Sequence, residues 1–214
     1  MTHRLFDDRG QANIIVVPVV VALLVVTLLL IRNLGSGVDE SRQARTAADA
    51  AALAAVDTWS DAIKTQFDLA RTSGSEDDFW QLVGRPLSWF TTRDALCASA
   101  DSFARKNGST LVSCVPGADG TVTVRVRDNR SLPDTGQQAE HSSTAQLQFV
   151  SGVCRSGSQI GYLIGRTCQT QAPAPAPPAA PIDPGAPAPA PVPSPAFTAP
   201  DGLGTFDIQA VIVA

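Results

Sequence analysis

A long apolar run near the N-terminus is the strongest feature of the hydrophobic pattern. Residues 14–31 are all apolar apart from Thr27, counting Pro18 as apolar. As a helix, this run is roughly 27 Å long, close to the thickness of a bilayer's hydrocarbon core. No small-residue cleavage site follows it. The pattern predicts a cytoplasmic tail at residues 1–12 and a retained transmembrane helix at 13–34, rather than a cleaved signal peptide or a buried core helix.

Small residues recur at steps of three and four after residues 35–37 (Gly-Ser-Gly), where we expect a hinge. This stripe consists of Ala44, Ala48, Ala51, Ala52 and Ala55, and Trp59, Ile63 and Phe67 continue it. The spacing predicts an Ala-rich helix over 35–71 whose small face permits close packing. Two interpretations are open: the helix packs on its own domain, or Ala44, Ala48, Ala51 and Ala55 form a packing face for neighbouring subunits.

Residues 72–170 combine helical and strand periodicities and predict a small α+β domain. Ser75 followed by Asp78 fits a variant of the capping box. A helix is expected from about Leu87 to Lys106, before an Asn-Gly stop. Alternation in "STLVSCV" and "TVTVRVR" predicts a hairpin, and "STAQLQFV" predicts a further strand. The expected fold class is therefore α+β with an antiparallel sheet.

The C-terminal part is a low-complexity segment followed by a short alternating stretch. Twelve of the 16 prolines lie between Pro173 and Pro200, which predicts a disordered Pro/Ala-rich linker at residues 171–202. Fully extended at about 3.1 Å per residue, the stretch from Pro173 to Pro200 would reach nearly 90 Å, a useful spacer through a cell wall or away from the membrane. Residues 203–214 predict a strand with Phe206, Ile208, Ala210 and Ile212 on one face. This strand docks either on its own sheet or on a partner subunit.

The four cysteines indicate in which cellular compartment the part after the apolar run lies. Cys97, Cys114, Cys154 and Cys168 all follow the apolar run. An even number in a small domain favours disulfides in an oxidising compartment. Arginines flank the run on both sides, so the cysteines decide for a cytoplasmic N-terminus and an extracytoplasmic bulk. The natural pairs are Cys97 with Cys114 and Cys154 with Cys168, although all three pairings stay open.

Composition excludes several classes of function. The formal net charge is −4 and the basic residues are scattered, which argues against nucleic-acid binding. His141 is the only histidine beyond the first residues and no C-x-x-C pair occurs, so we expect no metal and no cofactor. No catalytic constellation stands out, and we expect neither an enzyme nor a small-molecule substrate. The "LPDTG" at 132–136 fits a turn better than a sortase signal.

Several motifs flank the apolar run. Arg9-Gly10 precede it, and Asp39, Gln43 and "AADAAALA" at 47–54 follow it. Together they resemble the N-terminal region of TadE/TadG-like proteins of Flp (tight adherence) pilus systems. The cysteine-bearing helix and hairpin near residues 96–127 more loosely resemble shorter TadE-like proteins. The resemblance implies a membrane-anchored, pseudopilin-like accessory subunit of a Flp/Tad-type pilus or related secretion apparatus. Its partners would be the membrane and other subunits, contacted through the Ala-rich helix or the C-terminal strand. The alternative is a stand-alone envelope adhesion or scaffold protein.

The resemblance also marks one processing site. Prepilin peptidase cuts after a glycine, which here corresponds to Gly10, with Gln11 as the new first residue. Processed pilins typically carry Glu at the fifth mature position to pair with a neighbour's N-terminal amine. This sequence has Ile15 there, and an unpaired charge inside the bilayer is costly. We therefore expect an uncleaved accessory subunit.

Overall fold

The computed structural model describes residues 11–131, 136–174 and 197–213, and of residues 11–16 and 30–41 it describes the backbone alone. Within these ranges the chain forms helices and two antiparallel sheets, so the predicted α+β class is confirmed. The elements in chain order are α1 (Gln11–Thr72), α2 (Glu76–Trp80), the 3-10 helix η1 (Leu87–Trp89), α3 (Arg93–Lys106), β1 (Ser109–Pro116), β2 (Thr121–Ser131), β3 (Gln138–Ser151), β4 (Val153–Ser156), β5 (Gln159–Ile164), β6 (Thr167–Gln169) and β7 (Asp207–Val213).

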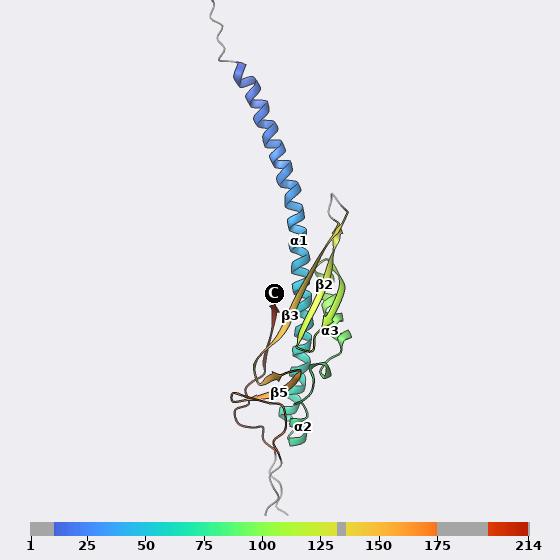
Figure 1. Cartoon of the computed structure of the whole chain (residues 1–214), viewed down its shortest axis with the longest axis vertical. Coiled ribbons are helices and arrows are strands. Elements are labelled where there is room, and N and C mark those ends of the chain that lie inside the picture. The colour runs from blue at the N-terminus through green and yellow to red at the C-terminus, as the bar shows by residue number, and fades with distance from the viewer. Residues whose placement is uncertain (1–10, 132–135, 175–196, 214) are drawn as a thin grey trace, which may run out of the picture.

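The longest element is α1, a single helix of 62 residues. Its first half projects from the domain and its second half packs along it (Figure 1). The hinge expected at residues 35–37 is wrong, because the helix continues through them. A glycine in a helix interior costs about 1 kcal/mol relative to alanine, which is too little to break a helix that good helix formers extend on both sides.

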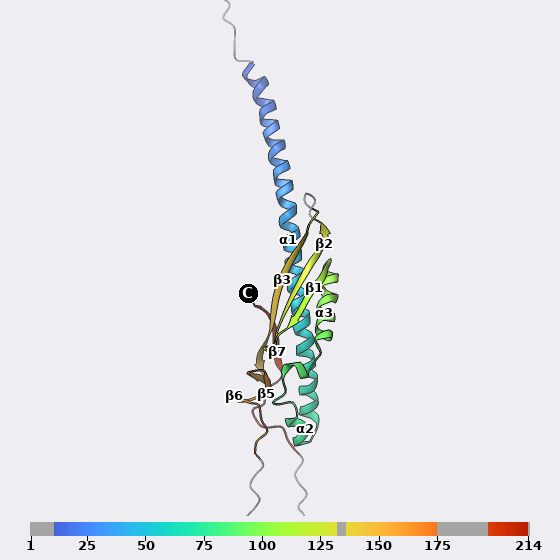
Figure 2. The same ribbon diagram turned by 45° about the vertical axis from the view of Figure 1, so that its right-hand side comes forward.

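The larger sheet has the strand order β1-β2-β3-β7, and every neighbouring pair is antiparallel. Helix α1 packs on β2, β3 and β7, while α3 packs on α1 and β1, so both helices cover the same face of the sheet (Figure 2). On β2, Val122, Val124 and Val126 point into this interface and are fully buried. The residues between them, such as Thr123 and Arg125, are exposed on the opposite face. The period-two pattern of the sequence is therefore the pattern of burial.

One predicted helix begins later than expected. Residues 87–89 form the short η1, and α3 starts at Arg93. Thr92 stops the helix from extending backwards, because its backbone is extended and its hydroxyl accepts a hydrogen bond from the N–H of Ala95 at 3.2 Å. This is ordinary N-capping. The predicted cap at Ser75 is present, since its hydroxyl accepts from the N–H of Asp78 at 3.4 Å.

Two disulfides fasten the domain. Cys97–Cys114 joins α3 to β1, and Cys154–Cys168 joins β4 to β6 in the smaller sheet, whose order is β4-β5-β6. Disulfide bonding, expected from the even number of cysteines, is confirmed, and the two natural pairs are the ones formed.

An aromatic cluster closes the end of the domain far from the projecting helix. Its members are Phe67, Phe79, Trp80, Tyr162, Phe197 and Phe206. The rings of Phe79 and Tyr162 stack with centroids 4.3 Å apart, and the Tyr162 hydroxyl donates to the carbonyl of Phe79 at 2.8 Å. Burial raises the pKa of the Tyr162 phenol. The hydroxyl therefore acts as a hydrogen-bond donor and not as an acid.

The residues that follow the Pro/Ala-rich segment pack at this cluster, where the ring of Phe197 lies 5.2 Å from that of Phe79. On the other side of the segment, Ala172 and Pro173 are exposed. The linker expected at 171–202 stays a prediction. Residues 175–196 lie outside the described residues.

The side chains described near the start of α1 are apolar and open to solvent. The large ones between Val17 and Leu29 are 48–65% exposed. Across the ranges that the structure describes, no helix has both the length and the apolar character that a membrane crossing requires. The anchor at residues 13–34 stays a prediction.

Candidate functional site

Gln43 ties α1 to the domain near the point where the helix leaves the sheet. Its side-chain N–H donates to the carbonyl of Asn107 at 3.3 Å, and its side-chain oxygen accepts from the Arg130 guanidinium. Gly108 permits this approach, since it adopts a φ of +70° and a Cβ there would lie 3.2 Å from the Gln43 nitrogen. We call Gln43, Asn107 and Arg130 the polar clasp. It connects α1 to the ends of α3 and β2.

Two buried polar side chains lie close to the clasp. Ser109 and Asp128 are cross-strand partners, and both are fully buried. One carboxylate oxygen of Asp128 accepts from the backbone N–H of Arg130 at 2.8 Å, and the other lies 3.6 Å from the Arg130 guanidinium. Arg130 is therefore held by a carboxylate on its own strand and by Gln43 on α1. A buried carboxylate that depends on one cation makes that cation structurally important.

Replacing Gln43 by alanine is expected to lower the free energy of unfolding by about 1 kcal/mol, because one partly buried and one exposed hydrogen bond are lost. Hydrogen exchange at Asn107 and Gly108 should accelerate, since the turn loses its contact with α1. Urea unfolding and amide exchange measure the two effects. Arg42→Ala, on the exposed neighbouring position, is the control. Equal changes in both variants would contradict a specific role of the clasp.

The four alanines proposed as a subunit-packing face lie inside the chain's own core. Ala44 is 1% exposed, and Ala48, Ala51 and Ala55 are fully buried. They lie on the stretch of α1 that packs on β2, β3 and α3. Their small side chains let the helix approach its own sheet closely, which is the first of the two interpretations. A neighbouring subunit that contacts α1 would have to use other residues while this fold persists.

The face of α1 away from the sheet carries acidic residues. Asp57 and Asp61 lie one turn apart, and partial burial of Asp57, followed by the repulsion of Asp61, raises the pKa of the Asp57 carboxyl. Since the unfolded chain releases this proton more readily, the group lowers stability as pH rises above its usual pKa.

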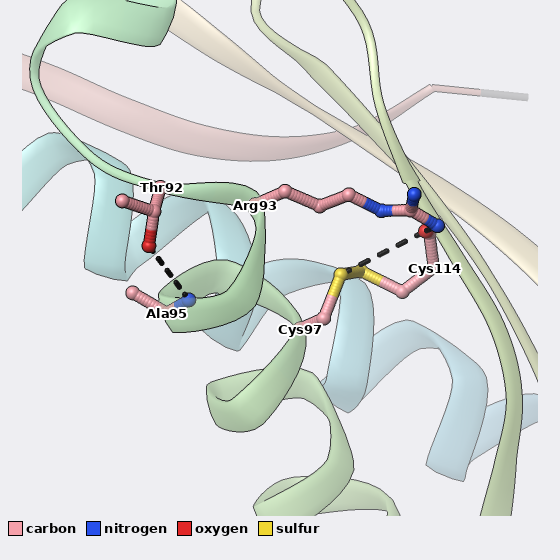
Figure 3. The surroundings of a disulfide bond; sticks show 5 residues. All are labelled: Thr92, Arg93, Ala95, Cys97 and Cys114. Atoms are coloured by element: carbon pink, nitrogen blue, oxygen red, sulfur yellow. Dashed lines mark hydrogen bonds between the residues drawn. A yellow bond between two sulfur atoms is a disulfide. The ribbon is translucent and has the colours of Figure 1, made fainter.

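The rim of β1 is covered by α3 (Figure 3). The Arg93 guanidinium donates to the carbonyl of Cys114 at 3.1 Å, and Cys114 is disulfide-bonded to Cys97 on α3. Sequence reasoning found the cysteines but missed Arg93 and Arg130. No local pattern marks either residue, because each acts on a partner that is distant along the chain.

The cavities offer little for chemistry. A recess of about 270 Å³ is lined mostly by apolar residues such as Trp59, Leu87 and Leu96. Arg93 is its one titratable lining residue among those described, and this guanidinium already donates to Cys114. No group of three or more His, Cys, Asp or Glu side chains suited to a metal ion occurs in the described part of the chain.

The expected processing site falls at the edge of the described residues. Gly10 lies outside them, and Gln11 is the first residue of α1. The structure places this residue at the far end of the projecting helix (Figure 1).

Comparison with known proteins gives one match, which covers most of α1. The family model Tad, described as Flp pilus-assembly TadE/G-like, matches residues 10–58. No curated protein and no solved structure matches the chain. The match covers the projecting part of α1, Gln43 of the clasp and the buried alanines, and it ends within α1, before the sheets. The resemblance inferred from the sequence is thus confirmed: residues 10–58 match the TadE/G-like family model of Flp pilus assembly.

Proposed function

We propose that this protein is a membrane-anchored accessory subunit of a Flp-type pilus-assembly apparatus. The family match carries the proposal, because it joins the apolar half of α1 and the docked half in one segment. A match to a family assigned to pilus assembly supports a location in the cell envelope and contact with other pilus subunits.

The anchor is supported by the chemistry of α1. Ten large apolar side chains between Val17 and Leu29 are 48–65% exposed. A contiguous apolar surface of this kind marks a contact with a membrane or with another protein. The apolar run extends over residues 14–31 in the sequence, long enough to cross a bilayer's hydrocarbon core. The two disulfides favour an oxidising, extracytoplasmic location for the domain. The N-terminus would then be cytoplasmic.

The docked half of α1 would hold the domain at a fixed orientation above the membrane. The clasp and the buried alanines fasten α1 to the sheet, so the membrane segment and the domain form one continuous rod. Such a subunit would act by contact with its neighbours. The surfaces left for contact are the outer face of α1, the open face of the sheet and the sheet's edges.

Substituting Leu24→Arg should release the protein from the membrane fraction, since an arginine at the centre of a spanning helix costs about 2.5–3.5 kcal/mol on the insertion scale. Carbonate extraction of membranes from cells that carry the pilus genes measures this, with pilus assembly scored in the same cells. Leu69→Arg is the control, because Leu69 is 59% exposed and lies outside the apolar run.

We expect wild type and Leu69→Arg to stay in the membrane pellet and to support pili, and Leu24→Arg to do neither. Normal pili in a strain lacking the protein would contradict the proposed function. Intact mass of the extracted protein should include residues 1–10, and a chain that starts at Gln11 would show prepilin-type processing instead.

A further inference from the structure

The two edges of the larger sheet differ in a way that points to a docking site. β1 and β7 are the outer strands, and an unpaired edge exposes backbone donors and acceptors to any passing strand. Natural proteins therefore protect such edges with bulges, prolines, charges or covering elements. The β1 edge has these protections along its length, whereas the β7 edge has them only at its first residue.

The β1 edge is protected in three ways. Its register shifts between Leu111 and Ser113, which interrupts a regular ladder. Pro116 has no N–H to donate. The N–H of Gly117 donates to the carbonyl of Thr121, so the backbone groups of Gly117 face β2. Because these groups alternate in direction along a strand, the carbonyl of Cys114, three residues earlier, faces the open edge. Arg93 occupies that carbonyl from α3 (Figure 3).

The β7 edge has fewer of these protections. Its sequence, DIQAVIV, contains no proline, lysine or arginine, and its one charged residue is Asp207 at the first position. The register with β3 shifts only at this end, between Phe149 and Ser151, and the pairing from Ile208 to Val213 is regular. No other strand of the described residues pairs with it. It is thus a regular strand that uses one edge only.

The pleat identifies which groups of β7 are free to bind. The N–H of Leu147 donates to the carbonyl of Gly120, the residue directly before β2, so the backbone groups of Leu147 face away from β7. Its partner Ala210 therefore directs its N–H and C=O outwards, and Ile208 and Ile212 do the same. Gln209 and Val211 direct theirs to β3. Three residues in alternation thus present an open ladder.

The side chains of Ile208, Ala210 and Ile212 are only incompletely buried. Ile208, Ala210 and Ile212 lie on the face of the sheet that α1 covers, but Ile208 and Ala210 are only partly buried and Ile212 is 42% exposed. A strand added beside β7 would cover these side chains and pair the outward backbone groups. It needs apolar residues on the α1 side, without charges there.

A second copy of the sheet does not fit this edge. Antiparallel pairing of β7 with the β7 of another copy requires a two-fold axis perpendicular to the sheet. Helix α1 runs along the strands (Figure 1, Figure 2), so the two projecting helices would point in opposite directions. Two copies anchored in one membrane, as the proposed function requires, cannot adopt this arrangement. The β1 edge of another copy is the protected one.

We propose that the β7 edge binds an extended strand from a different subunit by β-strand addition, with alternating apolar side chains directed towards α1. The ladder of Ile208, Ala210 and Ile212 supplies the backbone bonds. The choice of a different subunit rests on the proposed function, whereas the binding edge itself does not.

The test uses the full chain in nanodiscs and a fluorescent synthetic peptide, TFDIQAVIVA with two added N-terminal lysines, which carries no anchor and is free to pair with β7 in either direction. We expect saturable binding that slows amide exchange at Ile208, Ala210 and Ile212 and leaves Gln209 and Val211 as protected as before. Ile212→Lys should weaken binding by about tenfold or more, because it puts a charge on the covered side of the edge. Gln209→Lys, exposed on the other face, is the matched control.

Absence of binding, equal weakening by the two variants, or protection along β1 would each overturn the proposal. Loss of protection at Gln209 and Val211 would also overturn it, because the peptide would then have replaced β7. The assay contains no pilus apparatus, so its failure is distinct from failure of the proposed function.

Discussion

Replacing Phe67 by alanine will lower the free energy of unfolding by about 3–5 kcal/mol, the usual cost of removing a buried phenylalanine. Phe67 is fully buried on α1. Its ring lies 6.0 Å from that of Tyr162 and 5.5 Å from that of Phe206. The side chain therefore joins the helix to the smaller sheet and to the segment that leads into β7. Its loss leaves a cavity that three separate parts of the chain would have to close.

Chemical denaturation monitored by the fluorescence of the three tryptophans measures this loss. Leu69→Ala is the control on the same helix, since Leu69 is 59% exposed and should change stability by less than about 0.5 kcal/mol. Amide exchange in β7 should accelerate in Phe67→Ala and not in Leu69→Ala. A small effect of Phe67→Ala would mean that the aromatic cluster is not part of the cooperative core.

Removing the disulfide of α3 and β1, with Cys97→Ala and Cys114→Ala together, should lower the free energy of unfolding by about 3 kcal/mol. The two cysteines are separated by 17 positions, and the crosslink restricts the unfolded chain over that loop. The domain that remains depends on the packing of α3 against α1 through Leu96, Ala100 and Ala104, all buried.

Urea unfolding without reductant measures the effect. Wild type in the presence of reductant is the comparison, because it loses both disulfides and should be less stable than the double variant. A double variant as stable as oxidised wild type would contradict a stabilising role for this crosslink.

Periodicity predicted most of the elements. The valines of β2 alternate with Thr123 and Arg125, and the structure buries and exposes them in that order. The stripe from Ala44 to Phe67 is the buried face of α1. Such patterns are local, and burial follows directly from them.

The failures have physical causes. The glycines near residue 36 predicted a hinge, but each costs a helix only about 1 kcal/mol relative to alanine, and α1 continues through them. Arg130 and Gln43 are 87 positions apart, and no periodicity links positions at that distance.

Because α1 is unbroken, a tilt of its apolar part would move the whole domain with it. From residue 31 to Thr72 the helix rises about 62 Å, with no hinge between the apolar run and the aromatic cluster. In the proposed anchored state, a change of about 10° in helix tilt within the bilayer would move the far end of the domain sideways by about 11 Å. Bilayer thickness and the packing of neighbouring helices would then set where the open β7 edge is presented, without any change inside the domain.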